Sequence, residues 1–151
     1  MDYKVQSNSD LDTIELAQNI ESERFDKMVI CLYGDLGSGK TLFTKAFAKS
    51  MGIMDNITSP TFNIIKEYTG ENDSNLYHMD VYRLNEVKED LGIEEYFKKK
   101  GVTIIEWADQ IEDILPKKRL DIFFKIIDED KRIIKLVPHG EEYEELINRV
   151  L

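Results

Sequence analysis

The sequence predicts an α/β fold in which helices flank a mixed, mainly parallel central sheet with antiparallel hairpin additions. Two short apolar runs, 28–33 and 102–106, each precede a segment with helical spacing, as in parallel strands connected through helices. Two other pairs of extended segments are each joined by a polar turn, which predicts antiparallel hairpins. The chain has 151 residues, and we expect residues 1–151 to form a single domain.

The N-terminal part predicts a short strand near Val5 and then a helix. Residues 9–20 place apolar side chains on one helical face, with Ser9 or Asp10 as the N-cap. The run 28–33 is almost entirely apolar, which is typical of a buried parallel strand.

A glycine-rich motif follows that strand and reads Gly-Asp-Leu-Gly-Ser-Gly-Lys-Thr from Gly34 to Thr41. Residues 41–51 then repeat apolar residues at helical spacing, with Gly52 as the stop. A strand, a GxxxxGKT loop and a helix in this order predict a phosphate-binding loop of the kind found in P-loop NTPases. Backbone N–H groups would surround a polyphosphate, Lys40 would add a charge and the Thr41 hydroxyl could ligate Mg²⁺. The residues expected to bind the nucleotide here are Asp35, Leu36, Gly37, Ser38, Gly39, Lys40, Thr41 and Leu42.

The rest of the chain predicts two hairpins, a further strand and several helical segments. The first hairpin pairs 61–68 with 76–82 across a polar turn, and helical stretches follow between 84 and 100. Strand 102–106 and a helical segment, 108–115, come next. A second hairpin at 119–127 and 132–137 and an acidic helix at 141–151 complete the predicted elements.

Composition limits the possible partners. The net charge of −10 opposes direct binding to nucleic acid or to an anionic membrane. The N-terminus lacks an apolar signal region and no run is long enough to span a membrane, so we expect a cytoplasmic protein. Cys31, the single cysteine, lies inside an apolar run and is interpreted as a core residue.

Two acids stand where a phosphate loop needs them, at the ends of neighbouring extended runs. Asp80 ends 76–80 and Glu106 ends 102–106. A carboxylate in this position can hold Mg²⁺ or orient the water that attacks a γ-phosphate. Either residue could instead be a solvated strand end.

Three other features leave their interpretation open. In the Thr58–Phe62 segment two hydroxyl side chains directly flank a proline, and the segment is either an ordinary turn or a sensor of the γ-phosphate. His78 is interpreted as a core residue in preference to a polar contact. Trp107 fits a core aromatic, although a partly exposed ring could stack on a base or a partner.

Taken together, these residues resemble the TsaE family, small ATPases of bacterial tRNA threonylcarbamoyladenosine synthesis. The resemblance covers about residues 10–125 and rests on an ordered set of motifs. They are Tyr33–Thr41, Ser59-Pro-Thr-Phe62, Tyr77-His-Met-Asp-Val-Tyr-Arg83, Gly92-Ile-Glu-Glu-Tyr-Phe97 and Ile105-Glu-Trp107.

The resemblance assigns expected roles to individual residues. It implies that Lys40 and Thr41 act on the phosphates and Mg²⁺, that Asp80 and Glu106 serve the metal and the attacking water, and that Trp107 is functionally important. It places Thr61 in the switch-like segment and points to Thr13 and Arg132 as further nucleotide contacts. Ser38 stands where many members have alanine.

The resemblance also implies a function. The chain would bind ATP or ADP with Mg²⁺ and hydrolyse ATP slowly when alone. It would bind the TsaD subunit of the TsaD–TsaB complex and support threonylcarbamoyl transfer to tRNA adenosine.

Other interpretations of the loop stay open. A small-molecule kinase is one, although the five arginines are scattered rather than clustered as in a lid. A GTP switch is disfavoured because no Asn-Lys-x-Asp segment is present. A nucleotide-dependent adaptor, in which ATP sets only the conformation, would not require hydrolysis.

Overall fold

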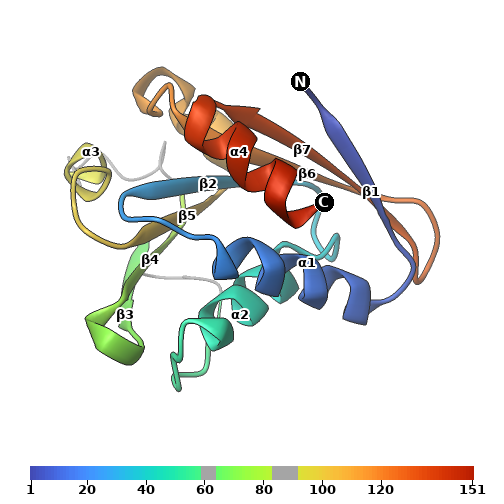
Figure 1. Ribbon diagram of the computed structural model, residues 1–151, viewed down its shortest axis with the longest axis horizontal. Coiled ribbons are helices and arrows are strands. Elements are labelled where there is room, and N and C mark those ends of the chain that lie inside the picture. The colour runs from blue at the N-terminus through green and yellow to red at the C-terminus, as the bar shows by residue number, and fades with distance from the viewer. Residues whose placement is uncertain (59–63, 83–91) are drawn as a thin grey trace.

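The computed structural model describes residues 1–58, 64–82 and 92–151 (Figure 1). The strands are β1 (Tyr3–Ser7), β2 (Met28–Tyr33), β3 (Ile65–Thr69), β4 (Asn75–Asp80), β5 (Val102–Glu106), β6 (Arg119–Ile126) and β7 (Arg132–His139). The α-helices are α1 (Asp10–Ser22), α2 (Lys40–Ser50), α3 (Ile93–Tyr96) and α4 (Glu141–Val150), and the 3₁₀ helices are η1 (Glu71–Asp73) and η3 (Ala108–Ile114). None of the helices in these described ranges has the length and apolar character needed to cross a membrane.

The strands form one mixed sheet in the order β1-β7-β6-β2-β5-β4-β3. The central strands β6, β2, β5 and β4 are parallel, whereas the pairs β1–β7, β7–β6 and β3–β4 are antiparallel. Short apolar strands such as β2 and β5 suit the centre because both of their faces are covered. The predicted α/β fold with a mixed sheet and hairpin additions is therefore confirmed.

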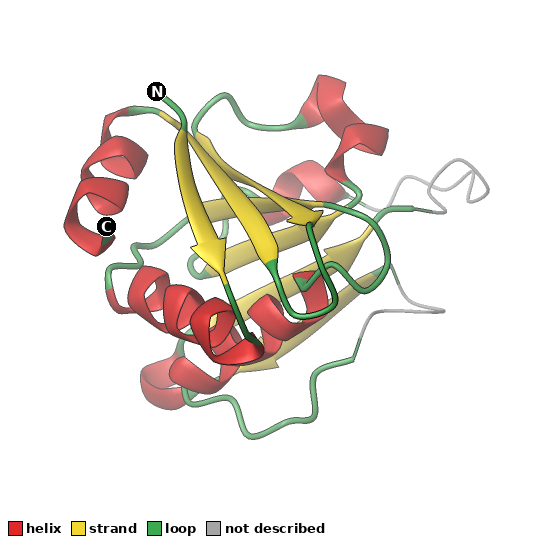
Figure 2. Cartoon of the chain, turned by 90° about the vertical axis from the view of Figure 1, so that its right-hand side faces the viewer, coloured by secondary structure: helices red, strands yellow, loops and turns green. Residues whose placement is uncertain are grey.

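The alternation of side chains along β2 divides the core between the two faces of the sheet. Met28, Ile30 and Leu32 pack with α1, α2 and α4, and Val29 and Cys31 pack with residues of α3 and η3 on the other face. Cys31 is fully buried, as expected of a core residue. Figures 1 and 2 show α1, α2 and α4 grouped together, and Figure 1 shows α3 away from this group.

Several predicted boundaries needed correction. The strand predicted to reach residue 82 ends at Asp80, because the Asp80 Oδ1 atom accepts a hydrogen bond from the Tyr82 backbone N–H at 3.0 Å and turns the chain. The helical segment predicted at 108–115 is a 3₁₀ helix with non-helical dihedral angles at Ile111. The predicted strand at 61–68 begins at Ile65 in the described residues, since 59–63 lie outside them, as do 83–91.

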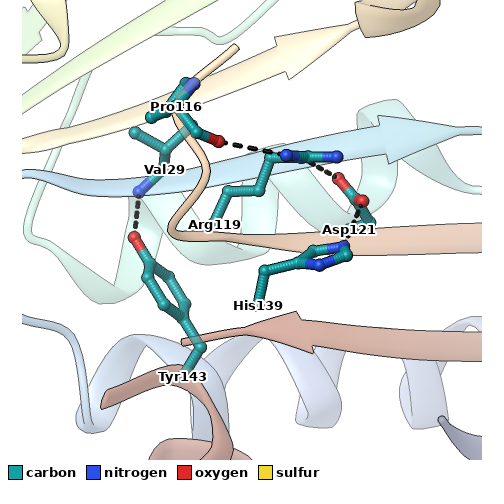
Figure 3. Close-up of polar contacts among 6 residues, drawn as sticks. All are labelled: Val29, Pro116, Arg119, Asp121, His139 and Tyr143. Carbon is teal, nitrogen blue, oxygen red and sulfur yellow. Dashed lines mark hydrogen bonds and ion pairs between the residues drawn. The ribbon is translucent and has the colours of Figure 1, made fainter. Parts of the chain in front are cut away.

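A polar cluster lies on the face of the sheet that α3 and η3 cover (Figure 3). The Arg119 Nε–H donates to Asp121 Oδ1 at 3.0 Å, and the His139 Nε2 atom lies 2.8 Å from Asp121 Oδ2. Arg119 Nη1 also donates to the Pro116 carbonyl at 3.0 Å. These bonds satisfy the buried Asp121 carboxylate and tie β6 to β7.

Helix α4 is fixed to the start of β2 by one buried hydrogen bond. The Val29 backbone N–H donates to the Tyr143 Oη atom at 2.9 Å (Figure 3). The β2–β6 ladder begins one residue later, at Ile30, so the tyrosine takes the place of a ladder partner.

Candidate nucleotide site

The glycine-rich loop connects β2 to α2 in a conformation that requires glycine. Gly34 has φ +151°, and a Cβ atom there would lie 2.8 Å from the Phe124 carbonyl oxygen. Gly39 has φ +116° and precedes α2, whose first hydrogen bond runs from the Phe43 N–H to the Gly39 carbonyl at 2.9 Å. Such positive φ values turn successive backbone N–H groups toward one side, as a bound anion requires.

The loop borders a cavity of about 350 Å³ at the edge of the sheet where the parallel strands end. A ligand site is expected at this edge of an open α/β sheet. Its lining includes the predicted residues Thr13, Leu36, Gly37, Ser38, Gly39, Lys40, Thr41, Leu42, Asp80, Glu106, Trp107 and Arg132. Residues from distant parts of the sequence therefore meet at one place.

One predicted site residue within the described ranges, Asp35, is not part of this lining. Asp35 is exposed and contributes its carbonyl oxygen to a bond from the Ser38 N–H at 3.0 Å, within the loop. Thr61 and the rest of the segment 59–63 lie outside the described residues.

Lys40 is buried and its Nζ atom lies 3.9 Å from the centroid of the Trp107 ring. This is a cation–π contact, which holds an ammonium group over an aromatic face. Burial lowers the pKa of Lys40, while attraction to Glu106 and Asp80 opposes that shift. The lysine charge is thus kept close to the two carboxylates.

Asp80 and Glu106 are register partners on the adjacent parallel strands β4 and β5. Burial raises the pKa of Asp80 and the negative charge of Glu106 adds to the shift, whereas the Tyr82 N–H bond opposes it. Glu106 is only 3% exposed, and its Oε2 atom lies 2.8 Å from the Nε2 atom of His78. Two carboxyl groups of different environment therefore face one cavity.

Trp107 follows β5 directly and has a strained backbone. Its φ of 62° places it in the left-handed region, which costs a non-glycine residue about 1 kcal/mol. The ring is half-buried, lies below Lys40 and contacts Tyr82 with centroids 4.8 Å apart. The side chain both lines the cavity and packs against the core cluster that contains Val29 and Cys31.

Thr13 and Arg132 approach the loop from α1 and from the start of β7. The Thr13 Oγ1 atom lies 2.8 Å from Ser7 Oγ, and Arg132 Nη2 donates to the Gly37 carbonyl at 3.3 Å. Both residues line the cavity, and their contact with a nucleotide stays a prediction. Ser38 has a buried hydroxyl without a hydrogen-bond partner among the described residues, so alanine would lose no such bond there.

Ser7, Ser9, Asp10 and Asp130 also line the cavity, although the sequence did not identify them as site residues. Ser9 and Asp10 are the predicted N-cap candidates of the first helix, and Asp130 lies in the turn between the strands of the second hairpin. Their place at the cavity depends on the pairing of β1 with β7, two strands from opposite ends of the chain. A local sequence pattern carries no signal for such a pairing.

The side chains at the cavity offer oxygen ligands. In the described ranges, no group of three or more His, Cys, Asp and Glu side chains could hold a metal by itself. Mg²⁺ is usually bound through one or two protein oxygens together with substrate phosphates and water, so Thr41, Asp80 and Glu106 fit it without such a group. The arrangement suits a ligand that brings its own phosphates.

Comparison with known proteins identifies similar chains. A family model described as "Threonylcarbamoyl adenosine biosynthesis protein TsaE" matches residues 7–134. A Bacillus subtilis (strain 168) protein named tRNA threonylcarbamoyladenosine biosynthesis protein TsaE is 52% identical over 120 residues, covering 78% of this chain and 74% of that protein. A Treponema pallidum (strain Nichols) protein of the same name is 39% identical over 108 residues, covering 70% of this chain and 78% of that protein.

A solved structure agrees with these relatives. The crystal structure of Bacillus subtilis YdiB matches the fold with a TM-score of 0.81 and 38% sequence identity. The match covers 99% of this chain and 94% of that chain.

Proposed function

Because the chain belongs to the TsaE family of tRNA threonylcarbamoyladenosine biosynthesis, we propose that it binds ATP with Mg²⁺ and hydrolyses it in support of threonylcarbamoyl transfer to tRNA adenosine. The TsaD–TsaB complex would carry out the transfer, and this chain would act on it through protein contacts in the cytoplasm. The observation that supports the proposal most is the cavity itself. It brings the glycine-rich loop, Lys40 and two carboxyl groups together.

Each part of the cavity has a role in this proposal. The backbone N–H groups of the loop and Lys40 bind the phosphates, and the α2 N-terminus adds its partial positive charge. Thr41, Asp80 and Glu106 would hold Mg²⁺, which neutralises charge on the phosphates when it is bound. Trp107, Thr13 and Arg132 contact the remainder of the nucleotide.

Hydrolysis would proceed by in-line attack of water on the γ-phosphate. Catalysis would come from positioning and from charge neutralisation, since phosphoryl transfer needs little covalent help from the protein. Arg132 is engaged by the Gly37 carbonyl and by three carbonyl oxygens of its own turn. Among the described arginines we therefore identify none that is placed to stabilise charge on the γ-phosphate. For this reason we expect the chain alone to hydrolyse ATP slowly.

The test measures ATP binding and hydrolysis with and without purified TsaD and TsaB, and tRNA modification by mass spectrometry. We expect slow hydrolysis alone, faster hydrolysis in the complex, and repeated modification cycles only with ATP and this chain. Lys40→Ala should lower ATP affinity by at least tenfold, because it removes the charge beside the loop. Failure of the wild-type chain to bind ATP would refute the proposal, and so would fast hydrolysis without partners.

The same assay separates the alternatives. A kinase would transfer the γ-phosphate to an acceptor instead of releasing inorganic phosphate. An adaptor would support modification even when hydrolysis has been removed by Glu106→Gln.

A further inference from the structure

His78 lies directly behind the cavity and contacts one of its acids. The side chain is 0% exposed and that of Glu106 is 4% exposed, and the His78 Nε2 and Glu106 Oε2 atoms are 2.8 Å apart. His78 does not itself line the cavity, whereas Glu106 does. The histidine is therefore placed to act on a ligand only through the glutamate.

The hydrogen bond indicates which nitrogen of His78 carries a proton. A carboxylate only accepts hydrogen bonds, so the Nε2–H must donate to Glu106. The Nδ1 atom is buried and has no partner among the described residues. A buried N–H without an acceptor would be costly at that position, so the hydrogen-bond geometry assigns the ring proton to Nε2.

The sheet holds the imidazole in this orientation. His78 stands opposite Ile104 in the β4–β5 register, on the same face as Asp80, two residues further along. Leu76 and Ile104 are fully buried on that face. An imidazole ring packed against these side chains has little rotational freedom. Its N–H therefore fixes the orientation of the Glu106 carboxylate.

We propose that His78 is a positioning residue: its Nε2–H fixes Glu106 Oε2 and thereby leaves Oε1 directed at the phosphate-binding cavity. Within the described ranges, Glu106 accepts its hydrogen bond from His78 alone. The proposal rests on the proposed ATP hydrolysis. It names a residue that sequence reasoning had treated as a core side chain.

A structural role for His78 would predict a different pattern of substitutions. If the ring only filled space, leucine would replace it and the donor would not matter. If the donor matters, glutamine should rescue function, because its amide nitrogen occupies nearly the position of Nε2. Asparagine is shorter and carries its amide nearer the position of Nδ1, so it should not.

The first experiment compares kcat and KM for ATP in the full chain with its partners. We expect His78→Leu and His78→Asn to lower kcat about 10- to 100-fold with KM changed less than threefold, the size seen when a group supporting a ligand is removed. His78→Gln should stay within about threefold of wild type. His139→Leu is the matched control, since His139, the other histidine, makes the same 2.8 Å bond to Asp121 away from the cavity.

A double-mutant cycle tests whether His78 acts through Glu106. Once Glu106→Gln has removed the carboxylate, His78→Leu should reduce kcat by less than twofold more. Equal activity of His78→Leu and wild type would overturn the proposal. So would equal loss in His78→Gln and His78→Leu, or an undiminished loss in the Glu106→Gln background.

A second measurement does not depend on hydrolysis. Imidazole ¹⁵N NMR of the nucleotide-free protein should show His78 with a protonated Nε2 and an unprotonated Nδ1, and the Nε2 signal should shift in Glu106→Gln. A protonated Nδ1 would overturn the assignment even if His78→Leu failed to fold. If wild type hydrolysed no ATP, the proposed function would fall and the positioning role with it, while the NMR result would still report whether His78 bonds Glu106.

Discussion

The two histidines of the chain form the same bond in two different surroundings. Each Nε2 atom lies 2.8 Å from a carboxylate oxygen, of Glu106 for His78 and of Asp121 for His139. Asp121 has a second donor in Arg119, so both of its oxygens are engaged (Figure 3). Among the described residues Glu106 has a partner for one oxygen only, and it borders the cavity.

The difference lies in what each carboxylate still has to bind. A buried carboxylate with all its bonds inside the protein contributes to the fold, and breaking one bond leaves a charge unpaired. A buried carboxylate with an open oxygen beside a lysine and a glycine-rich loop is available for a ligand. A histidine–carboxylate pair therefore predicts a contribution to stability at Asp121 and a role in ligand binding or catalysis at Glu106.

The largest expected effect is a difference in the rate of ATP hydrolysis between variants of the His78–Glu106 pair and of the His139–Asp121 pair. Glu106→Gln should reduce ATP hydrolysis at least 100-fold, because it removes the carboxylate that we propose serves the metal and the water. Asp121→Asn should change it less than threefold. Steady-state phosphate release with TsaD and TsaB present measures both, and comparable losses in the two variants would break the distinction.

The second expected effect is a difference in the free energy of unfolding between variants of Asp121 and of Glu106. Asp121→Ala leaves Arg119 and His139 without their acceptor and should lower the free energy of unfolding by about 2 kcal/mol, a value reduced because both partners are partly exposed. Glu106→Gln keeps an acceptor for His78 and should change it by about 0.5 kcal/mol or less. Urea denaturation at fixed pH provides the comparison. An Asp121→Ala chain as stable as wild type would show that the cluster contributes nothing.

A smaller effect should appear at Asp80, with the opposite sign. Burial raises the pKa of Asp80 in the folded state, so folding favours its protonated form and the stability from this group is lost as pH rises through the folded pKa. Asp80→Asn should therefore stabilise the nucleotide-free protein by about 0.5–1 kcal/mol at pH 7. The gain should vanish at a pH below the unfolded pKa. Thermal melting across pH 3–7 tests this, and a gain independent of pH would contradict the stated cause.

The smallest effect is spectroscopic. Trp107 is the single tryptophan, and its ring lies under the Lys40 ammonium. Lys40→Met should shift its emission maximum by a few nanometres without nucleotide, because the adjacent charge is removed. Lys45→Met is the control, since Lys45 is exposed and does not line the cavity. Identical spectra for wild type and Lys40→Met would show that the contact does not persist in solution.

Sequence patterns predicted the local parts of the molecule well. The strands Met28–Tyr33 and Val102–Glu106 have the predicted bounds. Gly34 follows the first apolar run, and three lysines and Gly101 precede the second. The cavity lining also contains most of the predicted residues, since a loop motif and two strand ends carry local signals. The segment after Trp107 forms a 3₁₀ helix instead of the predicted α-helix. It starts from Trp107 in the left-handed backbone region, which the sequence pattern did not predict.

Contacts between distant segments were beyond the reach of these patterns. Ser7 reaches the cavity because β1 pairs with β7, and His78 meets Glu106 because β4 lies beside β5. His78 was interpreted as a core residue, and it is buried, but burial alone did not reveal its acceptor. Thr61 lies outside the described residues, so its place in a switch segment stays a prediction.

The bond between Tyr143 and the Val29 N–H joins a helix outside the range of the family model to a strand inside it. The family model matches residues 7–134 and so ends before α4, whereas the YdiB structure matches 99% of this chain. The tyrosine of α4 completes the hydrogen bonding of β2, the strand that leads into the phosphate loop, and Leu146 and Ile147 are fully buried. Removal of α4 would therefore uncover part of the sheet beside the glycine-rich loop. A helix that the family model leaves out thus supports the strand that leads into the loop that the model includes.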